Sequence, residues 1–326
     1  MRVLVTGGTG FIGSHLVEAL LARGDEVRCL VRDGRRRGWL TGLDRVDVRV
    51  GDLSDPARLR TDVAGLDRVY HLAGLIKARS TGEFFEANAE GAGHLARACA
   101  ESPAPPARFI HLSSLAVLGP RATPVPATEG DSPRPVSAYG RSKLEGERRV
   151  LAAGKRLHVT VLRPPVVYGP RDRGVRTFAW WVARGVLPMP SGPPRHLSVC
   201  HVDDVVEALL AAGEGDIASG ELFHLASQGD VTWEEVGGAF AEALGVRPRT
   251  VRVPISIVLG LGALAELWAR VTRRPAIMSR GKVREATGHW VCDASKAQRM
   301  LGIAPRVELR QGVQRTVTWY RAAGWL

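Results

Sequence analysis

The sequence predicts an α/β protein, a doubly wound parallel sheet with a smaller C-terminal lobe. Short apolar runs of strand length alternate with helical repeats of apolar residues through the first half of the chain. The connections between them are short, as in parallel sheets that carry helices on both faces. Beyond residue 170 the alternation loosens, and a chain of 326 residues suits a large domain with a smaller one attached.

The first strand, turn and helix carry the strongest local signal. Three glycines, Gly7, Gly10 and Gly13, directly follow the apolar run 2–6 and open a helical repeat. Gly7 permits a tight turn, Gly10 lets a pyrophosphate approach the backbone, and Gly13 lets the helix pack closely on the strand. The helix N-terminus offers unpaired N–H groups to phosphates. The pattern predicts a dinucleotide-binding loop; the alternative is a tight turn that binds nothing.

The remaining elements follow in chain order. Further short apolar runs predict strands at 26–31, 46–50, 67–74, 109–113 and 158–162. Helical periodicity predicts helices at 83–101 and from Ser137, and later at 202–213, 232–245, 255–271 and 309–323. We expect a dinucleotide-binding domain over 1–170, to which part of 195–226 returns, and a mainly substrate-binding lobe over 171–326.

Composition excludes several classes of protein. The net charge of +12 and the pI near 10.4 would suit a nucleic-acid-binding protein, but the arginines are scattered among Ala, Gly and Pro, so we expect no nucleic-acid partner. The four cysteines are far apart, which predicts no metal site, no disulfide framework and a cytoplasmic location. The longest apolar run, 253–265, is shorter than the roughly 20 residues of a spanning helix.

The end of the second strand bears on the choice of cofactor. An acidic residue at this point holds the ribose of NAD, whereas an arginine accepts the 2′-phosphate of NADP. Arg32 stands there, and its planar fork matches phosphate oxygens. We therefore predict NADP(H) as the cofactor, with NAD(H) as the alternative. The explanation without a role in binding is that Arg32 is simply a solvated residue at the end of a strand. Asp52 follows the third strand, where it could accept from an adenine amino group or cap the next helix.

Tyr139 and Lys143 form the candidate catalytic pair. They are four residues apart at the start of a helix and so share a face. A nearby ammonium favours the phenolate, which would let Tyr139 exchange a proton with an alcohol or carbonyl oxygen. Ser114, at the end of the fifth strand, would hold that oxygen by a second hydrogen bond. Alone, the Tyr–Lys spacing is common on helix surfaces; with the glycine turn and Ser114 it is a strong signal.

Seven motifs occur in order along nearly the whole chain. They are TGGTGFIG (6–13), GDL (51–53), HLAG (71–74), the serines at 113–114, YGRSK (139–143), RPPVVYGP (163–170) and HVDDV (201–205). Together they resemble the extended short-chain dehydrogenase/reductase superfamily, often labelled NAD(P)-dependent epimerase/dehydratase.

The resemblance implies a Rossmann-type sheet of about seven strands and a C-terminal substrate lobe. It implies Tyr139 as acid/base, Lys143 on the nicotinamide ribose while lowering the pKa of the tyrosine, and Ser114 on the substrate oxygen. It also implies a homodimer through helices near 83–101 and 137–153. The cofactor-contacting candidates are Gly7, Gly10, Phe11, Ile12, Gly13, Arg32, Asp52, Leu53, Ala73, Gly74, Asn88, Tyr139, Lys143, Pro164 and Val166.

Departures from the family patterns indicate the branch. Leu115 and Ala116 stand where sugar-nucleotide dehydratases carry an Asp-Glu pair, and Pro164-Pro165 replaces the Phe-Asn of nucleotide-sugar epimerases. Leu197 replaces an arginine common in those epimerases. Each change removes polar recognition of a sugar diphosphate, and the C-terminal part resembles 3β-hydroxysteroid dehydrogenase-like and dihydroflavonol-reductase-like relatives.

Two apolar features remain open at this level. The segment 254–268 suits a lid, a weak membrane-surface contact or an ordinary packed helix. Trp180 and Trp181 either line the substrate cleft or fill the core.

These observations predict an NADP(H)-dependent oxidoreductase that interconverts a carbonyl and a secondary alcohol on a hydrophobic small molecule, such as a steroid- or flavonoid-like ketone. The alternative within the same fold is a nucleotide-sugar epimerase with tightly bound NAD. The alternative from another class is a non-catalytic NADP(H)-sensing protein. The presence of Ser114, Tyr139 and Lys143 together argues against that last alternative.

Overall fold

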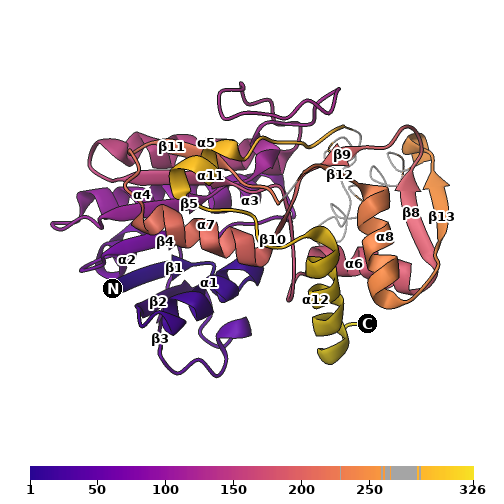
Figure 1. Cartoon of the computed structure of the whole chain (residues 1–326). Coiled ribbons are helices and arrows are strands. Elements are labelled where there is room, and N and C mark those ends of the chain that lie inside the picture. The colour runs from indigo at the N-terminus through magenta and orange to yellow at the C-terminus, as the bar shows by residue number, and fades with distance from the viewer. Residues whose placement is uncertain (228, 258–259, 261–264, 266–284, 286–287) are drawn as a thin grey trace.

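The computed structural model contains a large α/β part and a smaller lobe beside it (Figure 1). It describes residues 1–227, 229–257, 260, 265, 285 and 288–326. Most of the segment 254–268, and most of the helix expected at 255–271, therefore lie outside the described residues. Within the part that is described, no helix is both long and apolar enough to cross a membrane.

Seven parallel strands form the central sheet, in the order β11-β6-β5-β4-β1-β2-β3. They are β1 (Arg2–Thr6), β2 (Glu26–Val31), β3 (Val46–Val50), β4 (Arg68–His71), β5 (Arg108–Leu112), β6 (Val159–Arg163) and β11 (Glu221–His224). The strand order reverses beside β1, so the chain winds outward in both directions from that point. The predicted fold class is confirmed, with the first three strands at the predicted residues.

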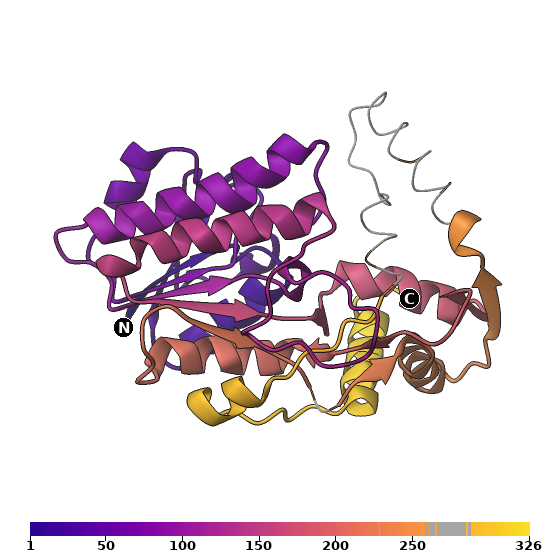
Figure 2. The ribbon, with the colours of Figure 1, turned by 90° about the horizontal axis from the view of Figure 1, so that it is seen from above.

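Helices cover both faces of the sheet (Figure 2). On one face lie α1 (Phe11–Ala22), α7 (Val202–Glu214) and α11 (Ser295–Leu301). On the other lie α2 (Pro56–Asp62), α4 (Gly91–Glu101) and α5 (Ala138–Ala152). Apolar side chains of the strands pack against each layer, because a parallel sheet with helices on both faces is buried on both.

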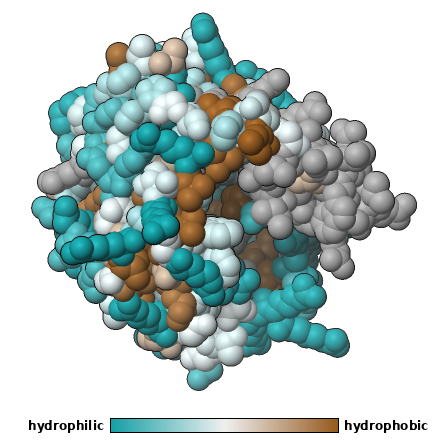
Figure 3. Space-filling model, turned by 90° about the vertical axis from the view of Figure 1, so that its right-hand side faces the viewer, coloured by the Kyte–Doolittle hydropathy of each residue, from teal (hydrophilic) through white to brown (hydrophobic). Residues whose placement is uncertain are grey.

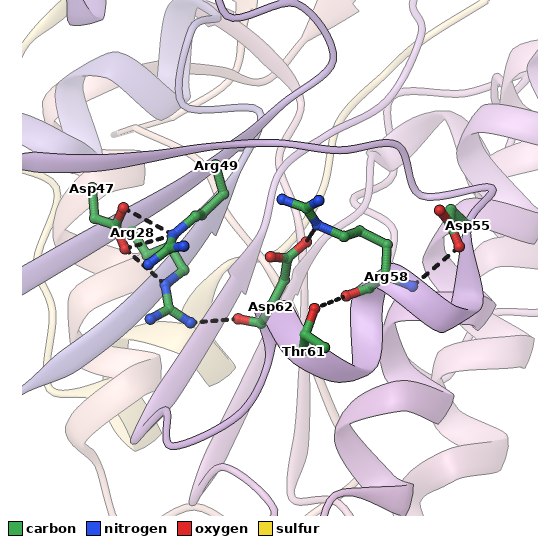
Figure 4. A network of polar contacts seen from close by, with 7 residues as sticks. All are labelled: Arg28, Asp47, Arg49, Asp55, Arg58, Thr61 and Asp62. Atoms are coloured by element: carbon green, nitrogen blue, oxygen red, sulfur yellow. Dashed lines mark hydrogen bonds and ion pairs between the residues drawn. The ribbon is translucent and has the colours of Figure 1, made fainter.

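Charged pairs close the β3 edge of the sheet (Figure 4). Arg28 on β2 faces Asp47 on β3, with 3.1 Å between Nε and Oδ2, and its Nη1 donates to the carbonyl of Asp62 at 2.7 Å. Arg49 also contacts Asp47 at 2.9 Å, and Arg58 contacts the side chain of Asp62 at 3.3 Å. Charged side chains on this edge strand also discourage pairing with another chain.

The smaller lobe has its own core. Its helices are α6 (Arg173–Ala183), α8 (Trp233–Leu244) and α12 (Leu309–Ala322). Its short strand pairs are β7 (Val166–Tyr168) with β10 (Val199–His201), β8 (Val186–Pro190) with β13 (Arg249–Val253), and β9 (His196–Leu197) with β12 (Val231–Thr232). The division of the chain at residue 170 stays a prediction.

Aromatic rings join the lobe to the larger part. Trp39, in the 3₁₀ turn η1 (Gly38–Leu40) after β2, packs edge-on against Trp319 of α12 with 5.5 Å between ring centroids. The guanidinium of Arg171 lies over the Trp39 ring at 5.2 Å and pairs with Glu18 of α1 at 2.6 Å. The loop after β2 is therefore held between α1 and the C-terminal helix.

The helix predicted at 83–101 is interrupted. The structure forms α3 (Thr81–Phe85), a π turn labelled η2 (Glu86–Glu90), and then α4. Asn88 lies in the π turn, and its backbone approaches α5 so closely that a Cβ on Gly146 would lie 2.3 Å from the Asn88 carbonyl oxygen. A π turn adds a residue to one helical turn and often marks a functional position. Helical periodicity alone did not reveal it.

We expect Gly146→Ala to lower the free energy of unfolding by about 1–3 kcal/mol, because the added methyl group would force α5 away from the π turn. The matched control is Gly238→Ala in α8, where an added methyl meets nothing within 4 Å. That change should raise the free energy of unfolding by up to about 1 kcal/mol, as alanine favours a helix. Denaturant titration measures both, and equal effects of the two substitutions would contradict this packing.

Candidate active site

The glycine turn lies at the carboxyl edge of the sheet. Gly7 has φ of +77°, and a Cβ there would lie 2.7 Å from the backbone nitrogen of Ala73, in the loop after β4. A Cβ on Gly13 would lie 2.2 Å from the carbonyl oxygen of Gly7. The turn, the first turn of α1 and the β4 loop thus meet at distances that only glycine allows.

This cradle fits the pyrophosphate of a dinucleotide. Gly10 is the N-cap of α1 and supplies no side-chain cap, so the N–H groups of the first turn, which includes Phe11 and Ile12, are not satisfied by a capping side chain. Unpaired N–H groups and the partial positive charge of a helix N-terminus bind phosphate oxygens. The residues present therefore suit the group that the sequence predicts.

Arg32 and Asp52 lie close to one another at the ends of β2 and β3. Hydrogen bonding by the Ser54 backbone lowers the pKa of Asp52, and the nearby Arg32 charge lowers it further. Asp52 is not the cap of α2, because Asp55 takes that role and accepts from the backbone nitrogen of Arg58 at 3.1 Å. Arg32 is exposed, and it forms no ion pair with a carboxylate among the residues that the structure describes. It is thus available at the predicted adenosine end.

Both polar atoms of the Asn88 side chain are engaged within the protein. Its Nδ2 donates to the carbonyl of Leu75 at 3.0 Å and to Oγ of Ser142 at 2.9 Å, while its Oδ1 accepts from the Leu75 backbone at 2.7 Å. It ties the loop after Gly74 to α5. The structure thus shows that Asn88 holds the segment after Gly74, and its predicted contact with the cofactor stays a prediction.

Tyr139 and Ser114 meet at the edge of a cavity. Ser137 caps α5 by accepting from the Gly140 backbone at 3.0 Å, which places Tyr139 in the first turn. Ser114 follows β5, and its side chain is close enough to Tyr139 to lower the pKa of that phenol. Burial raises the pKa of Tyr139, the Ser114 side chain lowers it, and the charge of Glu285 raises it.

Lys143 lies one turn further along α5. It is buried, and its Nζ donates to the carbonyl of Leu112 at the end of β5 at 2.7 Å. Burial lowers its pKa to about 8, against which the charge of Glu147 acts. The expected lowering of the pKa of Tyr139 by Lys143 is not what the structure shows: burial dominates there, and the ammonium is directed to a backbone carbonyl instead.

A cavity of about 520 Å³ opens from Ser114 and Tyr139 into the smaller lobe. Val166 and Pro165 line it, whereas Pro164 accepts from the Leu115 backbone at 2.8 Å. Its other lining residues are mostly apolar or aromatic: Leu115, Ala116, Phe178, Pro188, Met189, Pro190, Leu197, Trp233, Gly288 and Trp290, with the polar Arg195, His196 and Glu285. Figure 3 shows a hollow with hydrophobic walls on this side of the molecule.

Trp181 neither lines the cavity nor fills the core, so both alternatives predicted for it are wrong. The residue of α6 that faces the cavity is Phe178. Trp181 is 44% exposed, and Trp180 packs edge-on against it at 5.0 Å between ring centroids. Neither lines the cavity, while Phe178 does. Sequence reasoning also missed Arg195, His196 and Trp233, because their approach to the site depends on strand pairs within the lobe. The sign of this lobe in the sequence was that the alternation of strand and helix patterns loosens beyond residue 170.

Comparison with known proteins agrees with this geometry. Residues 3–233 match the NAD dependent epimerase/dehydratase family. The chain is 36% identical over 327 residues to a ceramide reductase of Caulobacter vibrioides, covering 99% of this chain and 96% of that protein. It is 31% identical to a 4-hydroxy-2-methyl-3-oxo-4-farnesyl-3,4-dihydroquinoline-1-oxide ketoreductase of Stigmatella aurantiaca over 334 residues, covering 96% and 95%.

A solved structure shares the whole architecture. MoeE5 in complex with UDP-glucose and NAD superposes with a TM-score of 0.78 at 27% identity, covering 99% of each chain. The glycine cradle of this chain suits the same kind of cofactor. The chain therefore belongs to the NAD-dependent epimerase/dehydratase family of extended short-chain dehydrogenase/reductases, and it is an enzyme that uses a nicotinamide dinucleotide.

Proposed function

We propose that the protein is an NADP(H)-dependent oxidoreductase that interconverts a carbonyl and a secondary alcohol on a hydrophobic small molecule. The observation that carries this proposal is the cavity that begins at Ser114 and Tyr139 and has mostly apolar walls. Two relatives that the chain resembles along almost their full length are named as reductases, one of ceramide and one of a farnesyl-substituted dihydroquinoline oxide.

Each polar residue has a separate task in the reduction. The cofactor, when bound, supplies a hydride to the carbonyl carbon. Tyr139 donates its hydroxyl proton to the carbonyl oxygen, so the ketone gains two electrons and two hydrogens and becomes an alcohol. Ser114 donates a hydrogen bond that orients the same oxygen. Lys143, whose Nζ is anchored to the Leu112 carbonyl, is the buried cation one turn further along α5 and is expected to contact the nicotinamide ribose.

The cavity favours this reaction over sugar-nucleotide epimerisation. Solved relatives are described with UDP-sugars bound. In this chain, however, Pro165 and Leu197 line the cavity at the two positions where polar recognition of a sugar diphosphate is expected in that branch. A cavity with apolar walls gives little stabilisation to sugar hydroxyl groups, which would lose water without gaining partners.

The preference for NADP(H) rests on Arg32. Its guanidinium is exposed at the end of β2 and close enough to Asp52 to lower the pKa of that carboxyl. A guanidinium there can form charge-assisted hydrogen bonds with a 2′-phosphate, whereas NAD offers only a hydroxyl at that position.

Tyr139→Phe should lower kcat for ketone reduction by about 10²–10⁴-fold, the usual contribution of a general acid. The Kd for NADPH should change little, because the hydroxyl is not needed to hold the pyrophosphate. The matched control is Tyr168→Phe: that hydroxyl is buried and has no hydrogen-bond partner among the described residues. Near-normal turnover of the Tyr139 variant would refute the assignment.

The reduction rate should fall as pH rises through about 8, where buried Lys143 loses its proton. The loss should come from chemistry and not from unfolding. The pKa of this lysine is about 8 in the folded chain, against a reference value of 10.5. Between these two pH values the unfolded chain binds more protons than the folded chain. The contribution of Lys143 to the free energy of unfolding therefore rises with pH in this range. Rates and melting temperatures across this range test both statements; a constant rate up to the reference pKa contradicts the first.

Arg32→Gln should raise the Kd for NADPH about tenfold and leave the Kd for NADH unchanged, since a charge-assisted hydrogen bond to the 2′-phosphate is lost. Arg49→Gln serves as control, because Arg49 is exposed on neighbouring β3 and already pairs with Asp47. Fluorescence titration with both cofactors measures the effect. Equal affinity of the unmodified protein for NADPH and NADH would remove the basis for the preference.

A further inference from the structure

The two sides of the cavity differ in their polar chemistry. Ser114 and Tyr139 reach it from the sheet side, at the ends of β5 and the start of α5. His196 reaches it from β9 in the smaller lobe, and Arg195 from the residue just before that strand. Apolar and aromatic residues make up most of the remaining wall. The proposed reduction uses the first pair and leaves the second pair without a task.

Arg195 is half-buried in this wall without a carboxylate among the described residues to pair with. The other half-buried arginines of the described chain have a partner for the guanidinium, either a carboxylate or a backbone carbonyl. Arg171 binds Glu18 at 2.6 Å, and Arg108 and Arg176 donate to the carbonyls of Gly215 and Trp325. A guanidinium on an apolar wall loses part of its hydration. An anion that takes the place of the lost water stabilises the charge.

His196 lies next to Arg195 on the same wall of the cavity. Its Nδ1 contacts Oδ2 of Asp230 at 2.6 Å, which fixes the ring and leaves the other ring nitrogen for a ligand. The His289 ring lies 5.6 Å from that of His196, and burial, His196 and Arg195 all lower the pKa of His289. Asp230 is thus already engaged by His196.

The carboxylate in the described wall of the cavity is Glu285, and its charge acts on Tyr139. Glu285 lines the cavity and raises the pKa of Tyr139, so its field is felt at the catalytic tyrosine. Arg195 and Tyr139 enter the cavity from different elements, the segment just before β9 and the start of α5.

We propose that Arg195 and His196 bind an anionic head group, so that the substrate is an amphipathic ketone or alcohol with a carboxylate or phosphate ester and a long apolar body. The inference rests on the proposed function of the same cavity. The planar fork of a guanidinium matches two oxygens of either anion. The volume of about 520 Å³ lies within the range of sites that enclose a drug-sized ligand, which leaves room for the body between Arg195 and Tyr139.

Binding tests this proposal without requiring turnover. Calorimetric titration compares a long-chain fatty acid with its methyl ester, which keeps the apolar chain and removes the charge. The acid should bind about tenfold more tightly than the ester, corresponding to one charge-assisted contact. Arg195→Gln should abolish that difference, and Arg195→Lys should keep part of it. Arg252→Gln, an exposed arginine of β13 outside the cavity wall, should leave it intact.

Turnover then separates this proposal from the proposed function. Oxo fatty acids with the ketone at successive carbons, and their methyl esters, are assayed with NADPH. A lower KM for the acids than for the esters, lost in Arg195→Gln and kept in Arg252→Gln, supports the anionic end. Equal binding and equal KM for acids and esters overturns it and leaves the reductase intact. Preferential acid binding without any NADPH oxidation supports the anion site and defeats the proposed function.

A nucleoside diphosphate is the competing source of the anion. UDP is titrated as the probe into the unmodified protein and into Arg195→Gln. Binding of UDP that depends on Arg195, together with no preference for the fatty acid over its ester, would overturn the amphipathic substrate and assign this end of the cavity to a sugar nucleotide. Absence of UDP binding, with the acid preferred, supports the proposal.

Discussion

The close approach of α5 to the π turn is the constraint on which the active site depends. Gly146 permits it, because any larger side chain would meet the carbonyl of Asn88 at 2.3 Å. The amide of Asn88 then fastens the loop after β4 to Ser142. Since Tyr139 and Lys143 belong to α5, one helix packing sets their positions against the loop where the cofactor is expected. A shift of α5 would misplace both groups at once, and small misplacements are costly in catalysis.

Burial controls the electrostatics around Lys143. It lowers the pKa of this lysine to about 8 and the pKa of His71, at the end of β4, to about 3. His111 stacks on His71 at 5.2 Å between ring centroids, and burial and the Lys143 charge lower its pKa as well. The imidazoles beside the lysine are therefore neutral, and Lys143 is the cation next to the reaction. The buried carboxylate of Glu147, one turn along α5, favours the charged lysine.

The smaller lobe supplies what distinguishes this chain from others with the same sheet. The walls of its cavity are mostly apolar, and β9 with the residue just before it brings His196 and Arg195 to the cavity. The aromatic contact between Trp39 and Trp319 joins the loop after β2 to the C-terminal helix of that lobe. The cofactor side and the substrate side are thus packed against each other, although the residues concerned are far apart in sequence. Since one fold serves many reactions, the chemistry must be argued from these walls.

The sequence alone determined the α/β class, the positions of the first strands, the glycine turn and the spacing of Tyr139 and Lys143. These are local: strand and helix periodicity, backbone freedom of glycine, and neighbours on a helix depend on residues a few positions apart. Tertiary structure decided that Asn88 lies in a π turn, that burial raises the pKa of Tyr139, and that Phe178 and not Trp181 faces the cavity. Those outcomes depend on which distant segments pack together, because desolvation and close contacts are properties of the assembled core and not of the order of residues along the chain.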